Sequence, residues 1–180
     1  MFIILKRFFR SKEEREAARL AFERKFAKSV RKVASGSRLQ HMDDYTQHGN
    51  TSTLLHSIAV SYFSCRLAYK FHLSYSEREL IRGALLHDYF LYDWHEKDAS
   101  HSWHGFTHPG KALDNAKKDF ALTEREKDII RKHMFPLTPA VPRYRESVLV
   151  CLVDKWCSTI EVFKKNPYED LRMKFLPTEA

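Results

Sequence analysis

The sequence predicts an all-α fold: a single helical bundle with an additional amphipathic helix at its N-terminus. Three observations support this prediction. The 180 residues include only five glycines, apolar residues recur at helical rather than strand spacing along almost the whole chain, and several segments open with a helix-capping pattern. No two neighbouring segments make a convincing strand pair.

The first predicted unit is an N-terminal helical extension, residues 1–40. Ser11 and Glu14 form a capping box that begins a helix, and Ser35-Gly36 ends that helix. Its charged side chains are expected to face outward because the apolar residues form one stripe. The stripe consists of Leu20, Phe22, Phe26, Val30 and Val33.

The main domain is predicted to cover residues 41–165. A polar connection leads to a helix that begins at Thr51-Ser52 and has an extensive apolar face. A second capping box, Ser76 with Glu79, is expected to begin the next helix.

The second half of this domain begins with a long polar and aromatic loop, from about residue 92 to 107. His108-Pro109 is expected to start a helix, since proline is well tolerated at the first helical position. A capping box at Thr123–Glu126 begins another helix, and a last long helix is predicted over 144–163. Residues 166–180 are expected to be a C-terminal tail.

The formal charge of +8 and the pI near 9.4 predict attraction to polyanions. Much of the excess lies between Lys6 and Lys32. A basic helix face of this kind is usually only solvated, but nucleic acid, an acidic membrane surface or a partner helix are alternative binding partners.

No stretch approaches the roughly 20 apolar residues that a spanning helix needs, so we expect no transmembrane segment. Met1–Leu5 is apolar but too short for a signal-peptide core, which favours a cytoplasmic protein. The same segment, with the first helix, is a candidate homodimer contact. Cys65, Cys151 and Cys157 lie in apolar patterns and are expected to be buried, reduced thiols.

Four chemically reactive side chains interrupt apolar helical runs. His56 follows Leu54-Leu55, the pair His87–Asp88 ends a run of small and apolar residues, and Asp154 follows Leu152-Val153. A carboxylate in such a run costs several kcal/mol unless it is paired or binds a cation. Imidazoles and carboxylates together favour a divalent metal ion.

Each residue alone has a simpler explanation. A single buried His is more often a hydrogen-bonded core residue, and Asp154 alone is more often an ion-pair partner. The metal hypothesis therefore depends on all four residues occurring together, in this order.

In this order, His56, His87–Asp88 and Asp154 resemble the H…HD…D signature of the HD-domain phosphohydrolases. The resemblance covers the chain from about Leu54 to Glu161. It implies that the four residues ligate a divalent metal on a helical core and that a metal-activated water cleaves a phosphate ester. The doublet His87–Asp88 would be the catalytic pair, and Asp88 would bridge two metals if a second one binds.

Some members of this superfamily add two histidines between the doublet and the final Asp. His108 and His133 resemble these extra ligands; His104 competes with His108 for the first position, and His101 is a weaker candidate. The alternative is one metal, with these histidines binding phosphate. Imidazole ligands suit Fe, Mn, Co, Ni or Zn better than Mg, without selecting one of them.

The expected substrate is a small phosphorylated molecule, with a nucleotide as one candidate. Arg82, His104 and Lys111 are the candidate substrate-binding residues. The aromatic residues of the long loop form either a pocket wall that stacks on a base or a packed loop. They are Tyr92, Trp94, Trp103 and Phe106.

Two other classes of function fit the same residues. The six-residue set also permits a di-iron oxygenase of the HD type. A non-catalytic binding or scaffold protein would instead hold a structural metal and dock an acidic partner on its basic first helix.

Overall fold

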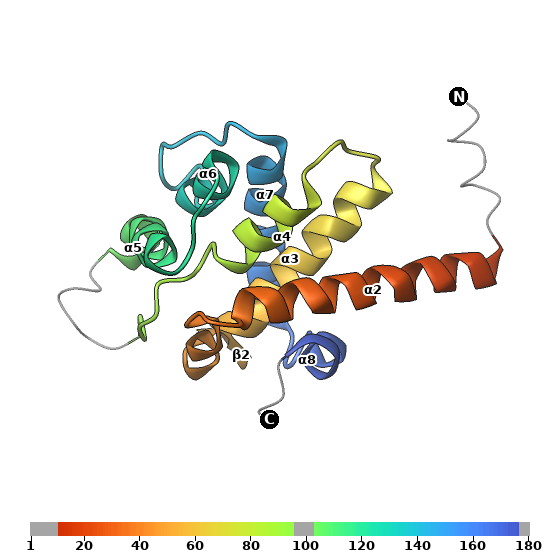
Figure 1. The fold of residues 1–180 in the computed structure, drawn as a ribbon. Coiled ribbons are helices and arrows are strands. Elements are labelled where there is room, and N and C mark those ends of the chain that lie inside the picture. Colours follow the sequence, from red (N-terminus) through yellow and green to blue (C-terminus); the bar gives the residue numbers. More distant parts are fainter. Residues whose placement is uncertain (1–10, 96–102, 177–180) are drawn as a thin grey trace.

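The computed structural model describes residues 11–95 and 103–176, and these residues form a mostly helical structure (Figure 1). Helix α3 lies at its centre, and as a result both its apolar and its small polar side chains are buried. The helices are α2 (Lys12–Ala34), α3 (Thr53–Lys70), α4 (Glu77–Leu85), α5 (His104–Asp119), α6 (Glu124–Lys132), α7 (Arg145–Phe163) and α8 (Glu169–Phe175), with a 3-10 turn η1 (Leu39–Asp44).

The predicted helical character of the chain is confirmed, and so are two of the capping boxes. The side chain of Ser11 accepts from the Glu14 amide at the start of α2, and Thr123 accepts from the Glu126 amide at the start of α6. In both boxes the glutamate returns a hydrogen bond to the backbone of the capping residue. Local polar side chains thus fix where these helices begin.

The third capping box is wrong. The side chain of Ser76 makes no capping hydrogen bond to α4. Instead, the Ser76 amide donates to Oε1 of Glu146, 2.9 Å away on α7. A distant acid therefore stabilises this helix start, which the local pattern did not reveal.

Two further expectations need correction. Residues 46–52 form a small antiparallel hairpin, β1 (Thr46–His48) and β2 (Thr51–Ser52), where no strand pair was expected. Helix α5 begins at His104, one turn before the predicted His108-Pro109 start. Pro109 is tolerated inside the helix, although it lacks an amide proton for the carbonyl four residues earlier.

The segment predicted as a C-terminal tail contains helix α8. Its Leu171 and Phe175 are buried, and the Phe175 ring lies 5.0 Å from the ring of Phe26 on α2. The tail therefore adds to the core between α2 and α3.

Helices α4 and α6 approach each other closely at Gly83. A Cβ atom at this position would lie 2.6 Å from Cδ1 of Ile129. A larger residue here would make Ile129 or the helices shift, so the glycine favours the close approach of α4 and α6.

All three cysteines are buried and free, as expected. Among the described residues, no helix combines the length and the apolar character needed to cross a membrane.

Candidate metal centre

Six side chains from five helical segments meet in the interior. His56 comes from α3, the pair His87–Asp88 follows the end of α4, His108 comes from α5, His133 ends α6 and Asp154 comes from α7. None of the six is more than 5% exposed. Residues spread over 98 positions of the chain thus share one buried site.

The first half of this centre contains His56, His87 and Asp154. The Nε2 atom of His56 lies 3.2 Å from Oδ1 of Asp154, and Nε2 of His87 lies 3.6 Å from the same oxygen. Oδ2 of Asp88 is 3.3 Å from His87 Nε2 and 3.7 Å from His56 Nε2.

The second half contains His108 and His133, on the other side of Asp88. Oδ1 of Asp88 lies 3.2 Å from Nε2 of His108 and 3.4 Å from Nε2 of His133. The two Nε2 atoms are 2.8 Å apart. Asp88 thus presents one oxygen to each half of the centre.

Backbone carbonyls fix the tautomers of three imidazoles. Nδ1 of His87 donates to the Ala84 carbonyl at 2.7 Å. Nδ1 of His108 donates to the His104 carbonyl, and Nδ1 of His133 to the Ile130 carbonyl, each at 2.9 Å. A carbonyl can only accept, so these Nδ1 atoms carry the proton. In the neutral ring each Nε2 then offers a lone pair to the centre.

With neutral imidazoles, the Nε2 lone pairs therefore face carboxylate oxygens and one another, and all of these atoms are hydrogen-bond acceptors. His87 Nε2 and Asp88 Oδ1 are both buried without a hydrogen-bond partner. Two sets of three side chains, His56-His87-Asp154 and His87-Asp88-His133, place one ligand atom each within 4.8 Å of the others. A divalent cation fits this donor set, because it satisfies imidazole and carboxylate lone pairs together.

The electrostatics show on which imidazoles a proton would compete with a cation. Burial opposes the charged form of His87, but Asp88 and Asp154 outweigh it and raise the pKa of His87 to about 9. The pKa of His56 is also raised, because Glu161 and Asp154 outweigh burial. Burial lowers the pKa of His133. The acids therefore favour protons on His56 and His87, whereas burial disfavours a proton on His133. A divalent cation would satisfy lone pairs in both halves.

Two residues that sequence reasoning missed hold the ligands in place. Glu161 accepts from Nδ1 of His56 at 2.8 Å, and Gln47 donates to Oδ2 of Asp88 at 2.8 Å. Glu161 follows Asp154 by seven residues on α7, two helical turns along the same face. That spacing was a readable signal; Gln47, in hairpin strand β1, offered none.

Aromatic rings border the centre from His56 to His108. The His48 ring lies 6.4 Å from His56 and 6.1 Å from Trp94, which stacks on His104 at 5.1 Å. The His104 ring in turn stacks on His108 at 4.5 Å. These rings form a continuous aromatic border beside the ligands.

The geometry distinguishes His108 from its competitors. His108 Nε2 reaches Asp88, whereas Nδ1 of His104 is hydrogen-bonded to the Tyr92 hydroxyl at 2.9 Å. His104 therefore lies beside the centre as a neighbour of the ligand. His101 lies outside the described residues.

The remaining candidates divide between this border and other parts of the surface. The Lys111 ammonium lies 4.5 Å from the centre of the Tyr92 ring, whose hydroxyl is hydrogen-bonded to His104. Trp103 and Phe106 are 77% and 48% exposed and are not part of a wall. The guanidinium of Arg82 binds the carboxylate of Glu126, with distances of 2.6 and 2.7 Å, so the structure does not bring it to the centre.

No protein-family model, curated protein or solved structure matches the chain. The candidate centre is therefore assigned from its own geometry.

Proposed function

We propose that the chain is a metal-dependent phosphohydrolase of the HD-domain type that cleaves a phosphate ester. One observation carries the proposal: Asp88 directs its two oxygens at two groups of imidazole nitrogens, all of them on buried side chains. Paired metal sites that share a carboxylate are suited to in-line displacement at phosphorus.

Each side chain has a role in this proposal. His56, His87, Asp154 and Oδ2 of Asp88 would hold one ion. Oδ1 of Asp88, His108 and His133 would hold the second. When bound, such ions lower the pKa of water and stabilise charge on phosphoryl oxygens.

The chain itself supplies orientation and selectivity. The Nδ1 hydrogen bonds hold the imidazole rings, and Glu161 and Gln47 hold His56 and Asp88 in turn. Beside the ligands, Lys111 and His104 would contact the phosphate of a substrate, and Trp94 would offer an aromatic face for the rest of it.

Metal analysis of protein purified without chelator, combined with anomalous diffraction, tests the proposal. We expect two ions that share Asp88, and only one ion in His133→Ala. A screen of nucleotides and simple phosphomonoesters should then give metal-dependent phosphate release. Two ions without release of phosphate from any phosphoester would refute the hydrolase.

Four imidazoles and two carboxylates also suit a di-iron oxygenase, and the same preparation distinguishes the two chemistries. Hydrolysis that proceeds equally with and without air, in iron- or manganese-loaded protein, supports the phosphohydrolase. Turnover that requires oxygen supports the oxygenase.

A further inference from the structure

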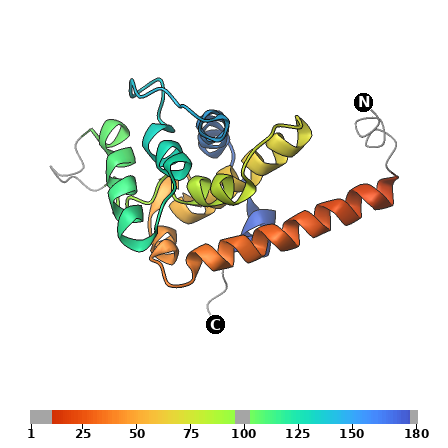
Figure 2. The same cartoon turned by 45° about the horizontal axis from the view of Figure 1, so that its top comes forward.

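Before Phe22, which packs beside Tyr62 of α3, α2 contributes no side chain to the core. From Lys12 to Phe22 no side chain is buried; the first buried ones are Glu23 and Phe26. Figures 1 and 2 both show this part of the helix continuing past the bundle. An isolated helix of this length is marginal in water, so a partner that packs against it would stabilise it.

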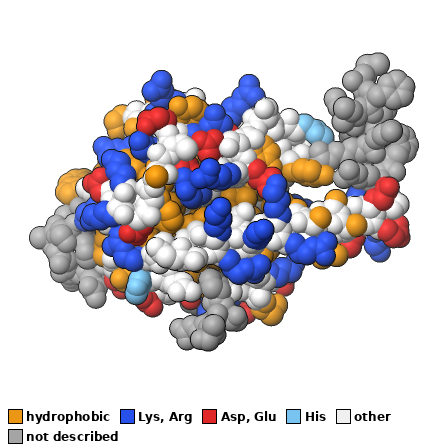
Figure 3. Space-filling model, in the orientation of Figure 1, with side chains coloured by type: hydrophobic (Ala, Val, Ile, Leu, Met, Phe, Trp, Pro, Cys, Tyr) orange, Lys and Arg blue, Asp and Glu red, His pale blue; other side chains and the backbone are white. Residues whose placement is uncertain are grey.

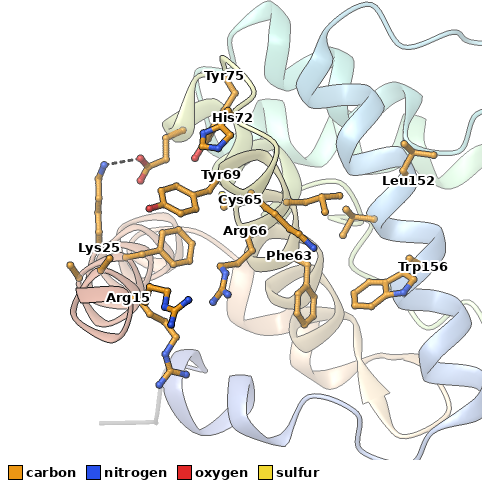
Figure 4. Close-up of a pocket in the computed structure, with 18 residues that line it drawn as sticks. Arg15, Lys25, Phe63, Cys65, Arg66, Tyr69, His72, Tyr75, Leu152 and Trp156 are labelled. Atoms are coloured by element: carbon orange, nitrogen blue, oxygen red, sulfur yellow. Dashed lines mark hydrogen bonds and ion pairs between the residues drawn. The ribbon is translucent and has the colours of Figure 1, made fainter. Parts of the chain in front are cut away.

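A groove lies between this part of α2 and the bundle, with a volume of about 930 Å³. Its floor is the outer face of α3, with α2 on one side and α7 on the other (Figure 4). Phe63 on the floor meets Trp156 of α7 edge to face, with ring centroids 5.0 Å apart. Trp156 is still 50% exposed and Leu152 61% exposed, so this apolar surface is open to a partner.

The rim of the groove is basic. Five Lys and Arg side chains line it against a single acid, Glu77, which is already paired with Lys25 at 2.8 Å. Among the described residues, no carboxylate forms an ion pair with Arg15, Arg66 or Lys70. Figure 3 shows Lys and Arg side chains along α2, with hydrophobic surface exposed between groups of them.

We propose that this groove binds an amphipathic helix of a partner protein, one with an apolar stripe flanked by acidic residues. Three helices enclose the groove, and its α2 wall runs from Arg15 to Lys25, about 15 Å at the usual helical rise. A helix of about three turns matches that length. Its apolar stripe would cover Trp156 and Leu152, and its acids would meet the unpaired cations.

Charge complementarity favours this occupant over two others. Residues 1–10 of the chain carry three basic residues and no acidic one. A second copy would bring another basic rim and a net charge of +8. Both would place like charges against the cations of the rim.

Selection from a display library of helical 14-residue peptides tests the proposal on the immobilised full chain. We expect enriched peptides to be acidic with apolar residues at i, i+3, i+4 and i+7. Synthesised peptides should bind Arg66→Glu/Lys70→Glu at least about tenfold more weakly than wild type. Lys117→Glu/Lys118→Glu, exposed on α5, is the charge-matched control and should bind normally.

A second pair of variants tests the apolar α7 side of the groove. Leu152→Gln should weaken the selected peptides, whereas Val162→Gln, exposed on the same helix outside the groove, should not. Circular dichroism should show that all four variants are folded.

Three results would overturn the proposal. The first is selection of basic or neutral peptides, or of none. The second is that the selected peptides bind both groove variants as tightly as wild type. The third is a groove already filled by another occupant. The last would be seen as a dimer that Leu152→Gln dissociates, or as anionic vesicle binding that Arg66→Glu/Lys70→Glu abolishes without any peptide binding.

Discussion

Three of the four histidines of the centre are oriented by their own helical segments, and the fourth, His56, by Glu161 of α7. His87 and His133 donate to carbonyls three residues earlier, and His108 to the carbonyl four residues earlier. The orientation of these three rings is therefore local, while convergence of all four depends on packing of the helices. Asp88 is different, because each of its two oxygens faces a different half of the centre.

Replacing Asp88 tests the bridge directly. We expect Asp88→Asn to lose at least one ion and to reduce metal-dependent hydrolysis by more than the roughly 10–100-fold typical of outer-shell changes. Metal content and phosphate release measure the two effects. Asp119→Asn is the matched control, since Asp119 contacts Arg38 and Tyr89 instead of the centre. Equal loss in both variants would show that the effect is general destabilisation.

Glu161 is expected to act through His56. Glu161→Gln keeps an acceptor for the Nδ1 proton but removes the charge, so metal affinity should fall about 10-fold. Glu161→Leu removes the acceptor and should approach about 100-fold. Competition with a chelator of known affinity measures both. Unchanged affinity in the leucine variant would contradict a positioning role.

At the scale of helices, one buried acid joins three elements. Glu146, in the first turn of α7, accepts from the Ser76 amide that begins α4 and from Arg125 of α6, 2.6 Å away. Its carboxylate thus caps one helix and neutralises a cation on another.

Removing this acid should destabilise the fold more than removing an exposed one. We expect Glu146→Ala to lower the free energy of unfolding by about 2–4 kcal/mol, because a helix-start amide and a charge lose their partner. Glu124→Ala, which breaks the exposed pair with Lys127, should cost less than about 1 kcal/mol. Urea denaturation compares them, and equal losses would contradict the joining role.

For the molecule as a whole, the sequence predicted what is encoded locally. Helical spacing and two capping boxes located most helices, and His or Asp within apolar runs identified buried polar groups. What it missed depends on distant partners: the Ser76 amide is capped from α7, and Gln47 reaches Asp88 from a hairpin. The apolar stripe of α2 also failed at Leu20, 44% exposed, because only tertiary packing decides where that stripe is covered.

Metal removal should affect the whole fold, since the centre draws ligands from five segments. At a free metal concentration 100 times Kd, binding adds about 2.7 kcal/mol to stability. For a chain of this size that corresponds to roughly 5–11 °C in Tm. Thermal unfolding with and without chelator measures the shift, and His133→Ala should show a smaller one. An unchanged Tm in wild type would argue against a bound ion.

The contact at Gly83 makes the second half of the centre sensitive to a single methyl group. Gly83 and His133 are linked by α6, because Ile129 meets the glycine and lies one helical turn before the histidine. Gly83→Ala would push on Ile129 and shift α6, which leads into His133, whereas His56 and Asp154 come from α3 and α7. We expect one ion in place of two in anomalous maps of that variant, which would make residue 83 a steric regulator of metal stoichiometry.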